Sequence, residues 1–154
     1  MNRLEHVRQI VDEILPQQPD PEQRRCGYVH MYGVSAICVL LALKRGLDPE
    51  ICGCMGMLHD IWNYKVGPNR NHARLGLPDA ERILKETGFT PDEIIVICTA
   101  ISHHSDKANT HSELDELLKD ADVFQHHLYN PALEPPWQEN KRLVRVFGEF
   151  GLDK

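Results

Sequence analysis

Three times in this sequence, a residue that caps helices stands directly before a segment with helically spaced apolar residues. Asp48 and Thr90 are each followed by a proline, and Ser112 is followed by acidic residues. A capping side chain accepts hydrogen bonds from the first free backbone amides, proline needs no amide partner at that position, and acids favour the positive end of the helix dipole. These signals indicate helices through the middle of the chain.

The rest of the chain continues this pattern, and we expect an all-α fold. Only the β-branched segment EIIVICTAI would suit a strand, but its helix cap and the lack of a hairpin partner favour a helix. A helix at 72–87 is expected to be interrupted at the segment GLPD. The expected helices span residues 3–14, 28–45, 49–64, 72–87, 91–104, 112–128 and 137–147.

A chain of 154 residues is long enough for one compact core and short for two. We therefore predict a single helical bundle of about six to seven helices over residues 1–154. Its core is expected at about 25–128, with the helices at 3–14 and 137–147 packing on it.

Composition and charge limit the classes of binding partner that we expect for this protein. The net charge is −6 and the cations are scattered, so nothing favours nucleic acid or an anionic membrane surface. The five cysteines lack CxxC spacing and fall within apolar helical patterns, which is typical of reduced thiols in a cytoplasmic protein. The first residues lack a signal-peptide core, and no uncharged run is expected to reach the roughly 20 residues that span a bilayer.

The pair His59-Asp60 stands in the apolar segment MLHDIWNY, where titratable groups are unusual. Gly53 and Gly56 share a helical face with Asp60, so a second helix has room to approach the backbone beside this acid. His30 lies on the same helical stripe as several apolar residues and is expected to point inward. The sequence thus predicts buried imidazole and carboxylate groups.

His104 and Asp122 continue the apolar stripes of two later helices. One inward histidine is more often a core residue with its hydrogen bonds satisfied than a metal ligand. Several such groups together cost on the order of several kcal/mol each unless a cation compensates them. Nitrogen and oxygen ligands without cysteine suit iron, manganese, cobalt or nickel better than structural zinc, with magnesium and catalytic zinc as further options.

The order of these groups resembles the motif of the HD-domain superfamily of metal-dependent phosphohydrolases. The resemblance covers about residues 25–128. The segments RCGYVHMYGV, GLDPE, MLHDI, HARLG, AISHH and LDELLKDAD are most similar to the branch that hydrolyses symmetrical dinucleoside tetraphosphates with two metals. The residues that carry the motif are His30, His59, Asp60, His72 in HARLG, the histidines of AISHH, and Asp122 in KDAD.

The resemblance implies how the metals are shared. Asp60 would bridge two divalent ions, and His104 would be a ligand because related sequences place one three residues after the dipeptide AI. His103 would lie beside the ligands in the catalytic site or act as an extra ligand. The implied ligands are His30, His59, Asp60 and Asp122 for one ion, and Asp60, His72 and His104 for the other.

Two departures from the family pattern concern phosphate binding. Many relatives carry a small residue and a lysine after the HD pair, where this chain has the segment IWN. Relatives also often carry an arginine three residues before the first histidine, where this chain has Gly27. Lys65 and Arg70 are the candidates to neutralise phosphoryl oxygens, and the alternative is that both are solvated loop charges.

The resemblance implies hydrolysis of a phosphoester or phosphoanhydride bond by metal-bound hydroxide, on a small anionic, nucleotide-like substrate. One alternative is a di-iron oxygenase on the same scaffold. Another is a nucleotide sensor without turnover, which the complete set of ligand positions disfavours. His126 and His127 are left out of the site because they are expected near an exposed helix end. A homodimer is one option for the oligomeric state.

Overall fold

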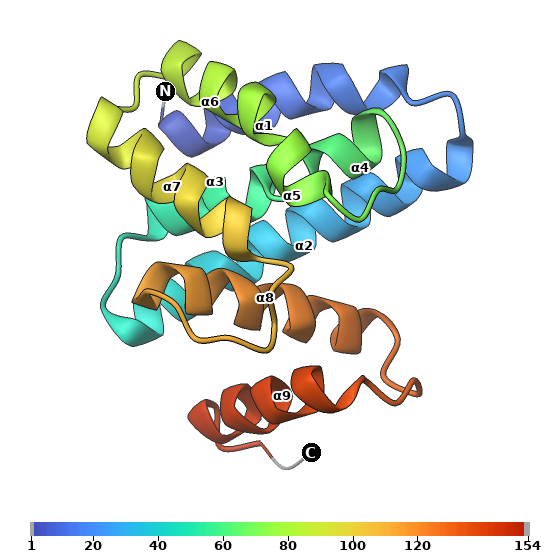
Figure 1. Cartoon of the computed structure of the whole chain (residues 1–154), viewed down its shortest axis with the longest axis vertical. Coiled ribbons are helices and arrows are strands. Elements are labelled where there is room, and N and C mark those ends of the chain that lie inside the picture. Colours follow the sequence, from blue (N-terminus) through green and yellow to red (C-terminus); the bar gives the residue numbers. More distant parts are fainter. Residues whose placement is uncertain (1, 153–154) are drawn as a thin grey trace.

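The computed structural model describes residues 2–152, and no strand occurs among them (Figure 1). The expected all-α class is confirmed. The helices are α1 (Arg3–Ile14), α2 (Pro21–Arg45), α3 (Pro49–Leu58), α4 (Ile61–Lys65), α5 (His72–Leu75), α6 (Leu77–Glu86), α7 (Pro91–His103), α8 (Glu113–Tyr129) and α9 (Trp137–Glu149), with a short 3-10 turn at Leu15–Gln17.

The caps act as the sequence predicts. The Asp48 carboxylate accepts hydrogen bonds from the first amides of α3, and Thr90 forms a reciprocal capping box with Glu93 at the start of α7. The start expected at residue 28 is wrong, because Asp20 caps α2 and Pro21 is its first residue. This start uses the same pairing of a cap with a proline, within the proline-containing segment LPQQPDPEQ that follows the first helix.

Two expected helices are each divided in two, so the bundle has more helical segments than the six to seven predicted. The helix expected at 49–64 ends at Leu58, and Asp60 has φ −112° and ψ 19°, outside the helical region. The helix expected at 72–87 is divided at Gly76, within the GLPD segment. The first division lies at the HD pair itself.

The long helix α2 is the centre of the bundle and packs against α3 on one side and α8 on the other (Figure 1). α1 and α7 lie against α3, and α9 lies along α8 at one end of the molecule. A Cβ atom on Gly56 would lie 2.7 Å from the Ser35 Cα, so α2 and α3 approach backbone to backbone here. The small residues before Asp60 therefore have the role that the sequence predicts.

By length and composition alone, α2 is apolar enough to cross a membrane, which contradicts the expectation that no segment qualifies. In this fold α2 is a core helix. Met31, Val34, Cys38 and Leu41 are fully buried, and packing against α3 and α8 accounts for this apolar face. All five cysteines are free, as expected.

Candidate metal centre

Six side chains from separate parts of the chain converge where α2, α3, α7 and α8 meet. His72 is half-buried and the other five are buried. His59 and Asp60 lie between α3 and α4, where the chain changes direction. The six residues are His30 on α2, His59, Asp60, His72 on α5, His104 at the end of α7, and Asp122 on α8.

Each of the four imidazoles is held through its Nδ1 atom. A carbonyl oxygen only accepts hydrogen bonds, so the proton lies on Nδ1, and Nε2 keeps a free lone pair. For three of the histidines the acceptor is the backbone carbonyl three residues earlier. The distances from Nδ1 to the carbonyl oxygen are 2.8 Å for His59 and Gly56, 2.7 Å for His72 and Asn69, and 2.7 Å for His104 and Ile101. The fourth histidine, His30, instead donates to the Gln125 side-chain oxygen at 2.7 Å.

The free Nε2 atoms face one another in two pairs. The Nε2 atoms of His30 and His59 are 3.0 Å apart, and so are those of His72 and His104. Two lone pairs at this distance repel unless a proton or a metal ion lies between them. The imidazoles are thus oriented to bind cations.

The two oxygens of Asp60 face different imidazole pairs. Oδ2 lies 3.4 Å from His30 Nε2, whereas Oδ1 lies 3.1 Å from His72 Nε2 and 3.3 Å from His104 Nε2. Asp122 Oδ1 completes the first group, 3.4 Å from His30 Nε2. Asp60 thus lies between the two imidazole pairs, and its bridging of two ions stays a prediction.

Two buried carboxylate oxygens, Asp60 Oδ1 and Asp122 Oδ1, have no hydrogen-bond partner within residues 2–152. An unsatisfied charged group is costly to bury, so each oxygen needs a positive partner. Their neighbours are the imidazoles with free Nε2 atoms, which makes a mixed nitrogen and oxygen donor set. These residues fit a divalent cation.

Burial and neighbouring charges shift the pKa values of the carboxylates at the centre in opposite directions. Burial lowers the pKa of His59 to about 3, so this imidazole is neutral. Burial alone would raise the pKa of Asp60, but the surrounding imidazoles outweigh it and hold that pKa well below its ordinary value. The pKa of Asp122 is also lowered, against burial, chiefly by the Lys107 ammonium. Both carboxylates are ionised and attract a cation.

Lys107 belongs to this centre, and the sequence analysis missed it. Its Nζ lies 2.5 Å from Asp122 Oδ2 and 2.7 Å from the His104 carbonyl oxygen. The lysine therefore fixes one oxygen of Asp122 and leaves the other facing the imidazoles. Lys107 lies in the loop between α7 and α8, where no helical period predicts which way a side chain points. The available signal was its place three residues after AISHH.

Three of the expected catalytic residues are not joined to the cluster. Lys65 makes an ion pair with Asp79 at 2.9 Å, and Arg70 is exposed, with no hydrogen bond or ion pair inside the described chain. His103 Nδ1 lies 2.6 Å from Asp115. His103 lies outside the cluster because consecutive side chains on a helix point about 100° apart, so only His104 faces inward.

His126, which we left out of the expected site, lies beside the cluster. Its ring stacks on that of His30 at 4.9 Å, and its Nε2 is 3.6 Å from Asp122 Oδ1. Its side chain is 55% exposed, so it stands at the mouth of the centre. His127 instead packs edge-on against Phe147. Of the two histidines, only His126 lies beside the cluster.

A small cavity of about 120 Å³ opens beside His30 and His126. The rings of Tyr64 and Tyr129 line it, and Arg25 Nη1 donates a hydrogen bond of 2.8 Å to the Tyr129 hydroxyl. The mouth therefore combines aromatic surface with a nearby exposed cation.

Comparisons with known proteins agree with this geometry. A family model described as the HD domain matches residues 27–126. A protein of Bacillus subtilis (strain 168) named "Putative phosphohydrolase YueE" is 28% identical over 127 residues, which cover 69% of this chain and 72% of the relative. No solved structure matches the chain significantly.

Proposed function

The chain belongs to the HD-domain family, and we propose that it is a metal-dependent phosphohydrolase that cleaves a phosphoester or phosphoanhydride bond of a small, nucleotide-like substrate. One observation carries the proposal. Four imidazoles with their Nδ1 atoms held aim free Nε2 atoms at two buried carboxylates whose Oδ1 atoms lack hydrogen-bond partners among residues 2–152. The name of the Bacillus relative supports the same class of reaction.

When bound, divalent ions acidify water and neutralise phosphoryl oxygens. The protein contributes position and charge. Asp60, Asp122 and the four histidines would hold the ions, while Lys107 fixes the direction of the Asp122 carboxylate. At the mouth, His126 and Arg25 are the polar groups placed to contact the phosphate chain and to orient it.

We take symmetrical dinucleoside tetraphosphates as the first substrates to test, because the motif segments resemble that branch. The tyrosine rings at the mouth also suit a base, since aromatic side chains stack on nucleobases. Simpler nucleotides and phosphate monoesters belong in the same panel, because the metal centre alone does not select among them.

The first measurement is the metal content per chain of protein purified without added metal or chelator. We expect close to two transition-metal ions per chain, and phosphate or nucleotide release that an Asp60→Asn variant lacks. Oxygen uptake with a polyol or phosphonate serves as the control if the metal is iron. Protein that neither contains metal nor rebinds it, or that consumes oxygen without releasing phosphate, would contradict the proposal.

A further inference from the structure

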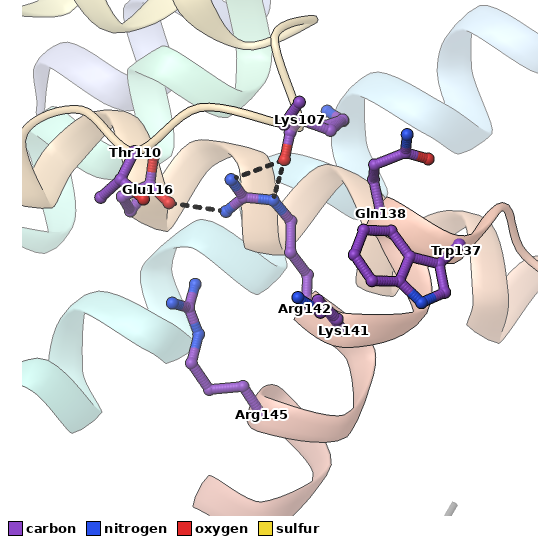
Figure 2. Close-up of a pocket in the computed structure, with 9 residues that line it drawn as sticks. Lys107, Thr110, Glu116, Trp137, Gln138, Lys141, Arg142 and Arg145 are labelled. Carbon is purple, nitrogen blue, oxygen red and sulfur yellow. Dashed lines mark hydrogen bonds and ion pairs between the residues drawn. The ribbon is translucent and has the colours of Figure 1, made fainter.

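A second hollow lies between α9 and the loop that leads into α8 (Figure 2). Its volume is about 320 Å³, within the range of roughly 300–1,000 Å³ that small-molecule sites occupy. It shares no lining residue with the cavity beside His30. We call it the α9 cavity, and its walls include Lys107, Trp137, Lys141, Arg142 and Arg145.

The α9 cavity is cationic in a chain whose net charge is −6. Its walls carry two lysines and two arginines against a single acid, Glu116. Arg142 is neutralised by Glu116 at 2.8 Å and by Asp120 at 3.1 Å. Arg145 also binds Asp120, but its side chain is 51% exposed. These groups leave a positive excess that faces solvent.

Lys141 supplies most of that excess. Its side chain is exposed, and no carboxylate between residues 2 and 152 lies within ion-pair distance of it. Its Nζ instead lies 4.2 Å from the centre of the Trp137 ring. This pair therefore presents an unneutralised ammonium next to an aromatic surface.

Trp137 is the aromatic wall of the cavity, and 67% of this residue is exposed. Trp137 and Arg142 both line the cavity, and the Lys141 ammonium lies over the indole ring (Figure 2). A large, solvent-exposed indole beside several cations is the combination that binds a planar base carrying a phosphate, since stacking and charge act together.

The α9 cavity and the metal centre are separated by Lys107. The backbone carbonyl of Lys107 accepts two hydrogen bonds from the Arg142 guanidinium, at 3.2 and 3.1 Å (Figure 2). Its ammonium reaches the other way, to Asp122. Because that ammonium is largely buried and points away from the cavity, a ligand in the α9 cavity would use the exposed side chains of Arg145 and Lys141 instead.

We propose that the α9 cavity is a second binding site, which takes a nucleotide and is distinct from the metal centre. The nucleobase stacks on Trp137, and the phosphate group binds to Lys141 and Arg145. The site binds without performing chemistry, and its existence does not depend on the hydrolase activity proposed above.

Indole fluorescence tests the proposal, because the chain has two tryptophans, Trp62 on α4 and Trp137 in the α9 cavity. In a Trp62→Phe protein as purified, with or without metal, we titrate AMP, ribose 5-phosphate and adenosine, and check by chromatography that AMP stays intact. We expect saturable quenching by AMP and binding of ribose 5-phosphate that is about tenfold weaker or less, because a stacked base adds to affinity.

Substitutions then assign the site. Lys141→Gln, alone and with Arg145→Gln, should weaken AMP binding, by about tenfold in the double variant. The matched control is Arg82→Gln with Lys85→Gln, which removes the same charge from α6 and should leave affinity unchanged. Lys141→Gln keeps the test valid if Arg145→Gln fails to fold, since Lys141 is outside the Asp120 network.

Two results would overturn the proposal. One is the absence of saturable AMP binding in the Trp62→Phe protein. The other is binding that Asp60→Asn abolishes and the Lys141 and Arg145 substitutions leave intact, since that places AMP at the metal centre. Loss of the proposed hydrolase activity would leave both readouts unchanged, so the two proposals fail separately.

Discussion

The metal centre and the α9 cavity both gather charged groups, but they satisfy them differently. At the centre, the imidazoles and carboxylates are mostly buried, and two carboxylate oxygens remain without hydrogen-bond partners in the described part of the chain. In the cavity, Asp120 and Glu116 neutralise arginines directly, and the remaining cations face water. The centre is therefore a site that needs an ion, whereas the cavity is stable without a ligand.

This difference also separates rigid from adjustable geometry. Three histidines of the centre are each held by a carbonyl three residues earlier, so their direction follows from the local backbone. Arg145 and Lys141 are long, exposed side chains whose position depends on solvent and on a ligand. Substitutions should therefore have their largest effects at the centre.

The largest effect is expected from Asp60→Asn. Asp60 is the residue that faces both imidazole pairs, and an amide loses the charge that holds two cations. We expect metal content to fall and kcat/KM to drop by at least about 10³-fold. Elemental analysis and phosphate release measure the two effects. Asp79→Asn, which removes the partner of Lys65, should retain both, and an active Asp60→Asn protein would refute the ligand assignment.

A smaller loss is expected from Lys107→Met. Residues that orient metal ligands typically contribute about 10- to 100-fold in metal affinity or activity, and we expect a loss in that range. Metal titration with a competing chelator measures it. Lys65→Met breaks only an exposed ion pair with Asp79 and should change activity by less than about twofold. The opposite ranking would restore Lys65 to the catalytic role that the sequence predicts.

The packing that positions the centre is tested by Gly56→Ala. The new methyl group would lie 2.7 Å from the Ser35 Cα and 2.8 Å from its nitrogen, so α2 and α3 must separate. We expect a loss of about 1–3 kcal/mol in the free energy of unfolding, measured with urea. Gly148→Ala on α9 meets no atom within 4 Å and should stabilise by up to about 1 kcal/mol. Equal effects at the two glycines would contradict the close approach.

The smallest effect concerns Glu116 at the α9 cavity. Burial alone would raise its pKa, but Lys119 and Arg142 outweigh burial and lower the pKa to about 2. Because the folded-state pKa is depressed, ionised Glu116 stabilises the protein above its ordinary pKa of 4.5, and this contribution is lost as the pH falls toward 2.

The protein with Glu116→Gln lacks this pH-dependent contribution. The difference in unfolding free energy between wild type and variant should shrink between about pH 6 and about pH 3, by less than about 1 kcal/mol because solvent screens these charges. Thermal unfolding of both proteins across this range measures the change. A difference that stays constant with pH would show that the pKa of Glu116 is not depressed in the folded protein.

Much of the fold is readable from local chemistry. Caps and prolines act over one turn, so the starts at Pro49, Pro91 and Glu113 are predictable from neighbouring residues. The break in the helix at the HD pair could not be predicted, because no residue in that apolar segment disfavours a helix. The backbone of Asp60 leaves the helical region where its carboxylate meets imidazoles from three other helices, and that is a tertiary effect.

The residues of the site also fall into those that the sequence predicts and those that depend on tertiary structure. Among the proposed ligands, His30, His104 and Asp122 were predictable from the helical period, and His72 was predictable only from the family motif. Lys107 and His126 were not, since one lies in a loop and the other at an exposed position. The α9 cavity was also unpredictable, because Arg142 meets the Lys107 carbonyl 35 residues away in the chain.

The hydrogen bond between His30 and Gln125 joins residues 95 positions apart, and that separation sets the order of assembly. Closing so long a loop costs entropy that a cation cannot offset while its ligands are scattered along an unfolded chain. Apolar packing of α2 against α8 must bring the ligands together first, so metal loading follows folding. Because a cation that binds only the folded chain also stabilises it, metal supply should raise the free energy of unfolding as well as fill the centre.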